Sequence, residues 1–148
     1  MEFTDYHTRL AAYALLVDED ERVLLAWWNG EGHSAPEWSL PGGGIDFEES
    51  IRDGLVREVF EETRYHVEPG TLLTDHFFTA RGRTFDGWIC SQRFVFDATI
   101  TGGELGTTEV DGSTDHAAWV PLAELEGQPR ADIVDVALAA WREKEARR

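Results

Sequence analysis

One segment of this chain combines helical periodicity with three acidic residues on a single face. If residues 50–63 form a helix, Glu58, Glu61 and Glu62 stand at positions i, i+3 and i+4, so their carboxylates lie within about 100° of arc. Like charges at these spacings repel one another by roughly a few tenths of a kcal/mol per pair. A hard divalent cation such as Mg²⁺, which prefers oxygen ligands, would remove that repulsion. The pattern predicts a metal site on a helix, and a solvated acidic face is the alternative.

The same segment has an apolar stripe beside its acidic face. Ile51, Leu55 and Val59 recur at helical spacing, so the helix can pack on a sheet while its acids stay at the rim. Gly54 interrupts the helix at a cost of about 1 kcal/mol relative to alanine. Close packing of the helix on the sheet would explain that glycine. Immediately upstream, residues 41–44 read Pro-Gly-Gly-Gly and predict a turn.

The spacing of residues 43–65 resembles the signature of the Nudix hydrolases. That signature is matched by Gly43, Glu49, Arg57, Glu58, Val59, Glu61, Glu62 and Tyr65. Arg64 departs from it, because the family has a glycine there. A glycine at this position ends the helix in the left-handed conformation. Arginine can adopt the same conformation at a cost of about 1 kcal/mol, and a different helix end is the alternative.

The resemblance implies a MutT-like hydrolase that cleaves the diphosphate linkage of a nucleoside diphosphate derivative by attack of an activated water on phosphorus. It implies that Mg²⁺, which Mn²⁺ can replace, is held by Glu58, Glu61 and Glu62. The backbone carbonyl of Gly42 or Gly43 would complete this ligand set.

The resemblance also implies catalytic roles. Glu58, or an acid distant in sequence, would serve as the general base, and Glu61 would act beside it. Glu49 would support the site from just before the helix. Arg57 would hold a carboxylate in place by a charge-assisted hydrogen bond. The candidates for a further acid outside the signature are Glu109, Asp111 and Asp115, which could equally be ordinary loop residues.

The rest of the chain predicts an α/β fold. Apolar and β-branched segments predict strands at 9–17, 23–27, 38–40, 72–79, 88–96 and 117–120. Residues 132–147 have the pattern of an amphipathic helix. These elements indicate a mixed β-sheet sandwiched between α-helices, similar to the α/β/α sandwich of the Nudix fold. With 148 residues, the chain is expected to form a single domain, 1–148.

The composition limits the kinds of ligand and partner that this protein can bind. A formal net charge of −16 argues against extended nucleic-acid binding, which needs a basic surface. It leaves room for a small nucleotide substrate, because bound divalent ions reverse the local field. No apolar run is long enough to span a membrane, no secretory leader is visible, and the single cysteine fits a reducing compartment. We therefore expect a cytoplasmic protein. Domains of this size commonly form homodimers.

The substrate-binding residues stay unknown at this stage. Side chains that could stack on a base or meet substrate are Trp27, Trp28, Trp38, Phe78, Trp88, His33 and His76, and those that could meet phosphate are Arg9, Arg81, Arg83 and Arg93. Each has an ordinary packing or surface role as its alternative. Two other functions stay open: a non-catalytic Nudix-like module that binds a nucleotide, and an isomerase on the same fold. The isomerase would need a reactive cysteine, and Cys90 lies in an apolar segment that favours a strand.

Overall fold

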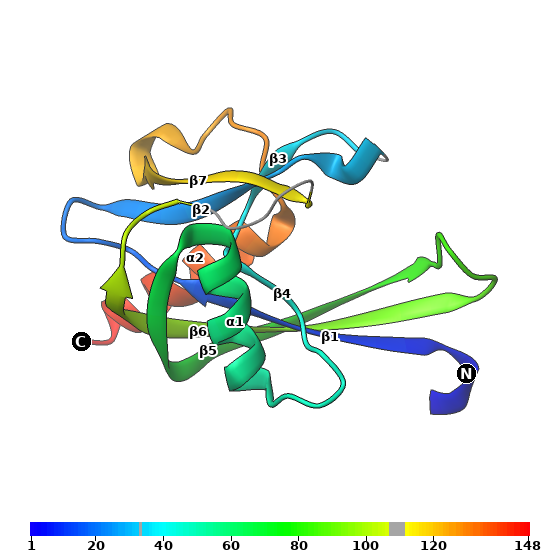
Figure 1. The fold of residues 1–148 in the computed structure, drawn as a ribbon. Helices are drawn as coiled ribbons and strands as arrows, with labels where there is room; N and C mark the ends of the chain where they lie inside the picture. The colour runs from blue at the N-terminus through cyan, green and yellow to red at the C-terminus, as the bar shows by residue number, and fades with distance from the viewer. Residues whose placement is uncertain (33, 107–111) are drawn as a thin grey trace.

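The computed structural model describes residues 1–32, 34–106 and 112–148 (Figure 1). Its strands and helices are β1 His7–Leu15, β2 Arg22–Trp28, β3 Glu37–Ser39, β4 Gly42–Gly44, α1 Ile51–Thr63, β5 Tyr65–Arg81, β6 Trp88–Gly103, β7 Thr114–Pro121 and α2 Asp132–Ala146. Short 3₁₀ turns lie at Phe3–Asp5, Gly30–Gly32 and Leu122–Glu124. The strands form two sheets, with the orders β4-β1-β6-β5 and β3-β2-β7.

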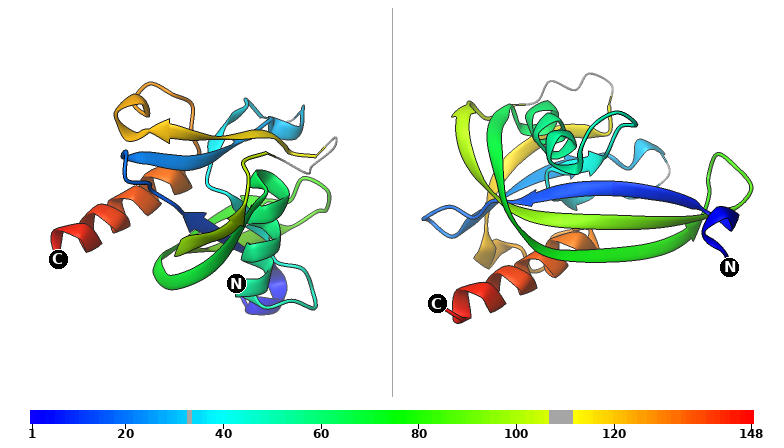
Figure 2. Two further views of the ribbon diagram at one scale, coloured as in Figure 1. Left: turned by 60° about the vertical axis from the view of Figure 1, so that its left-hand side comes forward. Right: turned by 90° about the horizontal axis from the view of Figure 1, so that it is seen from below.

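The two helices cover opposite faces of the strand layer (Figures 1 and 2). On β1, Ala12 and Ala14 pack in the cluster that contains Leu55 of α1. The alternate residue Leu15 packs in the cluster that contains Ile133 of α2. This alternation is what a strand between two apolar layers requires. The predicted α/β/α architecture is therefore confirmed.

The strand layer differs from the predicted single sheet. β1 and β6 are parallel, which makes the four-stranded sheet mixed, whereas β2 pairs antiparallel with β3 and β7 in a separate sheet. Among the described residues, an isolated bridge between Val17 and Val23 joins the two sheets where the chain passes from β1 to β2. Which strands belong to which sheet depends on pairing between segments that are distant in sequence. The local pattern of residues does not show these pairings.

Two strands are much longer than the predicted segments 72–79 and 88–96. β5 and β6 form a hairpin whose far end extends, with the start of β1, beyond both helices (Figure 2). Pro69 and Gly70 lie within β5. The pairing accommodates them through register shifts between Pro69 and Leu72.

The predicted turn at residues 41–44 is wrong. Gly42–Gly44 form the edge strand β4, antiparallel to β1. Gly42 has φ +144°, and a Cβ on it would lie 2.1 Å from the carbonyl oxygen of Ala12. Glycine is needed here because β4 approaches β1 too closely for a side chain.

Helix α1 starts one residue after the predicted start, Ser50, and ends at the predicted residue, Thr63. Ser50 caps its first turn by accepting a hydrogen bond from the Asp53 N–H at 3.0 Å. Arg64 follows the last turn in the left-handed conformation, with φ 65°, and its N–H donates to the Phe60 carbonyl at 2.8 Å. The guanidinium of Arg64 lies 5.7 Å from the centroid of the Phe60 ring. The expected helix end is thus formed by an arginine in place of a glycine.

Arg64 provides a stability test with a matched control. Arg64→Gly and Arg64→Ala both remove the side-chain contact with Phe60, but only glycine relieves the left-handed backbone strain. We expect the glycine variant to be more stable than the alanine variant by about 1 kcal/mol. Urea unfolding of the two variants measures this difference. Equal stabilities would show that the left-handed conformation carries no cost here.

Within the described residues, neither helix has the length and apolar character needed to cross a membrane.

Candidate active site

Arg57 of α1 lies at the centre of the acidic residues that the sequence singled out. Its Nη2 donates to Glu49 Oε1 at 2.6 Å and to the Gly44 carbonyl at 3.1 Å. Its Nη1 lies 3.1 Å from Glu58 and 3.4 Å from Glu61. The short contact goes to Glu49, eight residues upstream, and the i,i+4 contact to Glu61 is the long one. Arg57 is therefore anchored mainly on the segment before the helix.

The electrostatics of this pair keep both groups charged. The guanidinium of Arg57, with the N–H of Asp46, holds the pKa of Glu49 below its usual value. In turn, the carboxylate of Glu49 raises the pKa of Arg57. Asp46 N–H donates to Glu49 Oε1 at 2.8 Å, so the loop before α1 is tied to the same carboxylate. Glu49 thus positions Arg57 and the loop together.

Glu58 lies directly against the glycine strand. A Cβ on Gly43 would come within 2.9 Å of the Glu58 carboxyl carbon. Real Cβ atoms do not tolerate that distance, so the carboxylate owes its position to the glycine. Glu58 also lines the main cavity described below.

The structure separates Glu62 from the other two acids of the helix. Glu62 is 7% exposed, and its two carboxylate oxygens accept hydrogen bonds from the Gly42 N–H at 2.7 Å and from Thr114 Oγ1 at 2.6 Å. It joins α1 to β4 and β7. The side chain of Glu61 is 42% exposed. Across the described ranges, no three Asp, Glu, His or Cys side chains converge closely enough to hold one ion together.

The register of β4 distinguishes the two backbone carbonyls that the sequence left open. Both Pro41 O and Ile45 N–H bond to β1, so by alternation the backbone groups of Gly43 also point to β1. Those of Gly42 and Gly44 point away, toward α1, where they meet Glu62 and Arg57. The carbonyl of Gly42 lies on this outer edge, so it suits a metal ligand better than that of Gly43.

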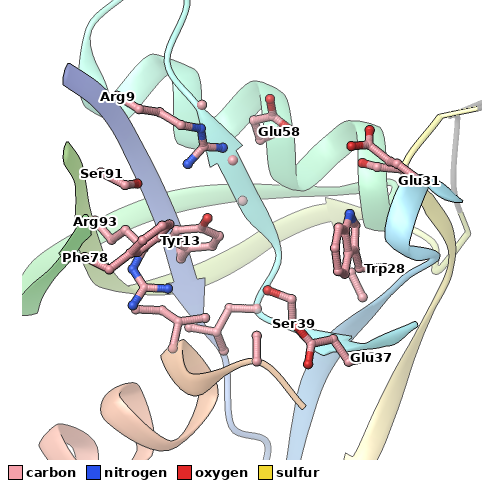
Figure 3. Close-up of a pocket in the computed structure, with 18 of the residues that line it drawn as sticks. Arg9, Tyr13, Trp28, Glu31, Glu37, Ser39, Glu58, Phe78, Ser91 and Arg93 are labelled. Atoms are coloured by element: carbon pink, nitrogen blue, oxygen red, sulfur yellow. The ribbon is translucent and has the colours of Figure 1, made fainter. Parts of the chain in front are cut away.

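A cavity of about 870 Å³ opens beside these groups (Figure 3). Its lining includes Gly42–Gly44, Glu58 and Glu62 on one side. Apolar and aromatic side chains line it elsewhere, namely Tyr13, Trp28, Leu40, Phe78 and Ile133. The carboxylates therefore face a space large enough for a nucleotide-sized ligand.

The aromatic candidates divide between this cavity and other sites. Trp28 and Phe78 line it. Trp27 and Trp38 instead pack edge to face in the core, with ring centroids 5.0 Å apart. Trp88 and Cys90 line a separate apolar hollow near the N-terminus. Cys90 is not among the residues that line the cavity with the carboxylates, so the isomerase interpretation loses its required cysteine.

All four candidate arginines, Arg9, Arg81, Arg83 and Arg93, line the main cavity. Arg93 is 5% exposed and pairs with Asp132 at 3.0 Å. Its guanidinium lies 4.9 Å from the centroid of the Phe78 ring and contacts His76 Nδ1. Hydrogen bonds from Arg93 hold the pKa of Asp132 below its usual value.

Sequence reasoning missed Glu37, Ser39 and Asp132, which also line the cavity. Burial, together with the negative charge of Asp132, raises the pKa of Glu37. Glu37 lies on β3 and Asp132 begins α2, so their proximity depends on tertiary packing. No local sequence signal could have identified them as a pair.

The acids proposed outside the signature are only partly described. Asp115 is exposed, accepts a hydrogen bond from Asn29 Nδ2 at 3.0 Å, and is not among the cavity-lining residues. Glu109 and Asp111 lie outside the described residues, as does His33.

Gly54 packs against the loop before the helix, and not against the sheet as predicted. A Cβ on Gly54 would lie 2.7 Å from Ile45 Cδ1 and 2.9 Å from Glu49 Oε1. The Glu49 oxygen is the one that Arg57 and Asp46 hold. The glycine therefore leaves room for the carboxylate that anchors Arg57.

Gly54→Ala is expected to lower the turnover number several-fold by displacing Glu49, although alanine favours the helix by about 1 kcal/mol. Steady-state kinetics and thermal unfolding measure the two effects. The double variant Ile45→Ala, Gly54→Ala removes the second clash and serves as the control. Recovery of full activity in the double variant would assign the loss to Ile45 and contradict the role of Glu49.

Comparison with known proteins gives the relatives of this chain. The NUDIX domain model matches residues 7–141. The human protein named 8-oxo-dGDP phosphatase NUDT18 is 39% identical over 137 residues, which cover 90% of this chain and 39% of that protein. The chain thus spans about two fifths of that relative's length.

Solved structures share the architecture. The crystal structure of a MutT NUDIX hydrolase from Burkholderia pseudomallei has a TM-score of 0.73 and 26% identity, and the match covers 90% of this chain and 98% of that one. A MutT protein from Methanosarcina mazei Go1 has a TM-score of 0.71 at 24% identity, covering 95% and 97% of the two chains. At that identity the second likeness supports the fold alone.

Proposed function

We propose, from the premise that this chain belongs to the Nudix family, that it is a divalent-metal-dependent hydrolase of nucleoside diphosphate derivatives. The supporting observation is the placement of Glu58 beside a glycine edge strand, with Arg57 anchored on Glu49, at a cavity of about 870 Å³. Phosphoryl transfer needs positioning and charge neutralisation more than covalent chemistry. The arrangement supplies oxygen ligands and fixed charges for both.

The donor set fits a hard cation. Glu58, Glu61 and the Gly42 carbonyl offer oxygen ligands of the kind that Mg²⁺ and Mn²⁺ prefer. The contacts of Arg57 with Glu58 and Glu61, at 3.1 and 3.4 Å, are longer than its 2.6 Å contact with Glu49. The two acids can therefore turn toward a cation while Arg57 stays in place. When bound, the cation would neutralise phosphate charge and lower the pKa of a coordinated water.

Each residue of the candidate site then has a distinct role. A carboxylate oxygen of Glu58, which faces the cavity, accepts the proton of the attacking water. Arg57 keeps Glu58 and Glu61 near one another, and Glu49 keeps Arg57 charged and oriented. Glu62 fixes β4 against α1 through the Gly42 N–H, and its further role as a metal ligand remains a prediction.

The human relative's name indicates an oxidised guanine nucleotide, so we propose 8-oxo-dGDP and 8-oxo-dGTP as the first substrates to test. A panel should add unmodified nucleoside di- and triphosphates, nucleotide sugars, ADP-ribose, dinucleoside polyphosphates and capped RNA ends. Each compound is assayed with Mg²⁺, with Mn²⁺ and with EDTA. We expect turnover that EDTA abolishes.

The outcomes separate the alternatives. Turnover that persists in EDTA would contradict the metal-dependent mechanism. Nucleotide binding without turnover of any compound would favour the non-catalytic module instead. For a compound that is hydrolysed, incorporation of ¹⁸O from labelled water identifies the phosphorus that is attacked.

A further inference from the structure

The main cavity is much less acidic than the chain as a whole. Four of its 13 basic residues line this cavity, against five of its 29 acidic residues, so the lining carries a formal charge of −1 (4 − 5) on a chain of −16. Arg81 pairs with Asp86, and Arg93 pairs with Asp132. In the described part of the chain, Arg9 and Arg83 form no ion pair. An unpaired guanidinium in a cavity points to an anionic ligand.

Arg9 lies where it can reach the glycine strand. It is exposed on β1, and its Nη2 is 3.6 Å from the position of a Cβ on Gly44. Figure 3 shows Arg9 projecting from β1 at the end of the cavity where Glu58 lies. In the sheet register Arg9 is level with Ser91 of β6, and Ser91 with Phe78 of β5. Residues level across paired strands share one face of the sheet, so these three side chains line the same wall.

Ser91 supplies an independent observation on this wall. It is 0% exposed, it lines the cavity, and its Oγ has no hydrogen-bond partner among the described residues. Arg93 lies two positions after Ser91 on the same face of β6, and its Nε likewise has no hydrogen-bond partner among the described residues. A buried hydroxyl without a partner costs about 1–3 kcal/mol. A ligand that accepts hydrogen bonds at this wall would remove that cost.

We propose that Arg9 and Ser91 form a metal-independent subsite for a phosphate group of the substrate. The proposal rests on the proposed function and extends it, because it assigns the substrate class as a nucleoside polyphosphate recognised through a phosphate as well as through bound metal. The planar guanidinium of Arg9 donates two parallel hydrogen bonds to phosphate oxygens. The buried Ser91 hydroxyl donates a third hydrogen bond to the phosphate.

Inorganic pyrophosphate in EDTA tests the subsite without turnover, because chelation removes the metal contribution. Isothermal titration calorimetry compares the wild type with Arg9→Gln, Ser91→Ala and Arg142→Gln, at about 0.1 M salt, where charges beyond about 10 Å are screened. Arg142 is exposed on α2 outside the cavity, so its variant matches the charge change of Arg9→Gln. We expect about a tenfold or larger loss of affinity for Arg9→Gln. For Arg142→Gln we expect a change within about twofold.

Ser91→Ala separates ligand binding from a purely structural role. We expect a several-fold loss of pyrophosphate affinity with no fall in Tm, since the variant removes an unsatisfied buried hydroxyl. Unchanged affinity with a raised Tm would remove Ser91 from the subsite. Circular dichroism verifies that every variant is folded.

The binding test of the subsite and the turnover test of the proposed hydrolase can succeed or fail independently. Wild-type protein that binds no pyrophosphate in EDTA, or Arg9→Gln that binds as well as wild type, would overturn the subsite even if turnover with Mg²⁺ is found. Binding that depends on Arg9, in a protein that hydrolyses no nucleotide, would support the subsite and contradict the hydrolase.

Discussion

Glu58→Gln is expected to lower kcat by about 10²- to 10⁴-fold on whichever nucleotide is hydrolysed. The amide keeps the shape of the side chain against Gly43, but it can neither accept a proton nor bind a cation as a carboxylate does. KM should change much less than kcat if Glu58 acts mainly in the transition state. Steady-state kinetics with saturating Mg²⁺ measures both parameters.

The control for Glu58→Gln is Glu68→Gln, the same change at an exposed position on β5 that does not line the cavity. Its kcat should stay within about twofold of wild type. Glu58→Gln should unfold at the wild-type temperature, because the change preserves volume. An active Glu58→Gln enzyme would remove Glu58 from both the general-base and the metal-ligand roles.

The second large effect concerns stability and separates two adjacent glutamates. Glu62→Ala leaves the buried Gly42 N–H and the Thr114 hydroxyl without the acceptors they have now, and it opens a space between α1, β4 and β7. We expect a loss of about 2–4 kcal/mol in the free energy of unfolding. Glu61→Ala, at a half-exposed position with a 3.4 Å contact to Arg57, should cost less than about 1 kcal/mol. Urea denaturation of the two variants measures the contrast.

For Glu61, the expected effect is the reverse: a large loss of activity with little loss of stability. Glu61→Gln should lose activity by orders of magnitude while its unfolding curve stays at the wild-type position. Thr114→Val should reproduce part of the stability loss of Glu62→Ala, whereas Thr114→Ser should restore it, because serine keeps the hydroxyl that bonds Glu62. Equal unfolding midpoints for Glu61→Ala and Glu62→Ala would contradict the structural role of Glu62.

Helix α1 shows which features follow from local sequence. Its span was predicted to within one residue, and a left-handed Arg64 was one of the two predicted ways for it to end, because side-chain periodicity and capping act over a few neighbouring residues. The opposite holds for β4. Three consecutive glycines express no preference between turn and strand, and only pairing with β1 made them an edge strand.

In the candidate site, too, some features follow from local sequence and others from tertiary contacts. Spacing along one helix identified Glu58, Glu61 and Glu62 as a set, but it could not show that Glu62 turns inward to Thr114, 52 residues away. Nor could it show that Gly54 makes room for Glu49. Both contacts join segments whose separation along the chain carries no periodic signal.

Residue patterns alone therefore established the family resemblance, the acidic helix and the presence of the main strands, since each depends on short-range geometry along the chain. Tertiary packing alone decided which glutamate is buried, which glycine carbonyl faces the helix, and which arginines share a cavity with Ser91. The physical reason is that contacts between segments distant in sequence set these positions. The backbone groups that make many of these contacts are the same in every residue except proline, so they leave no local signal in the sequence.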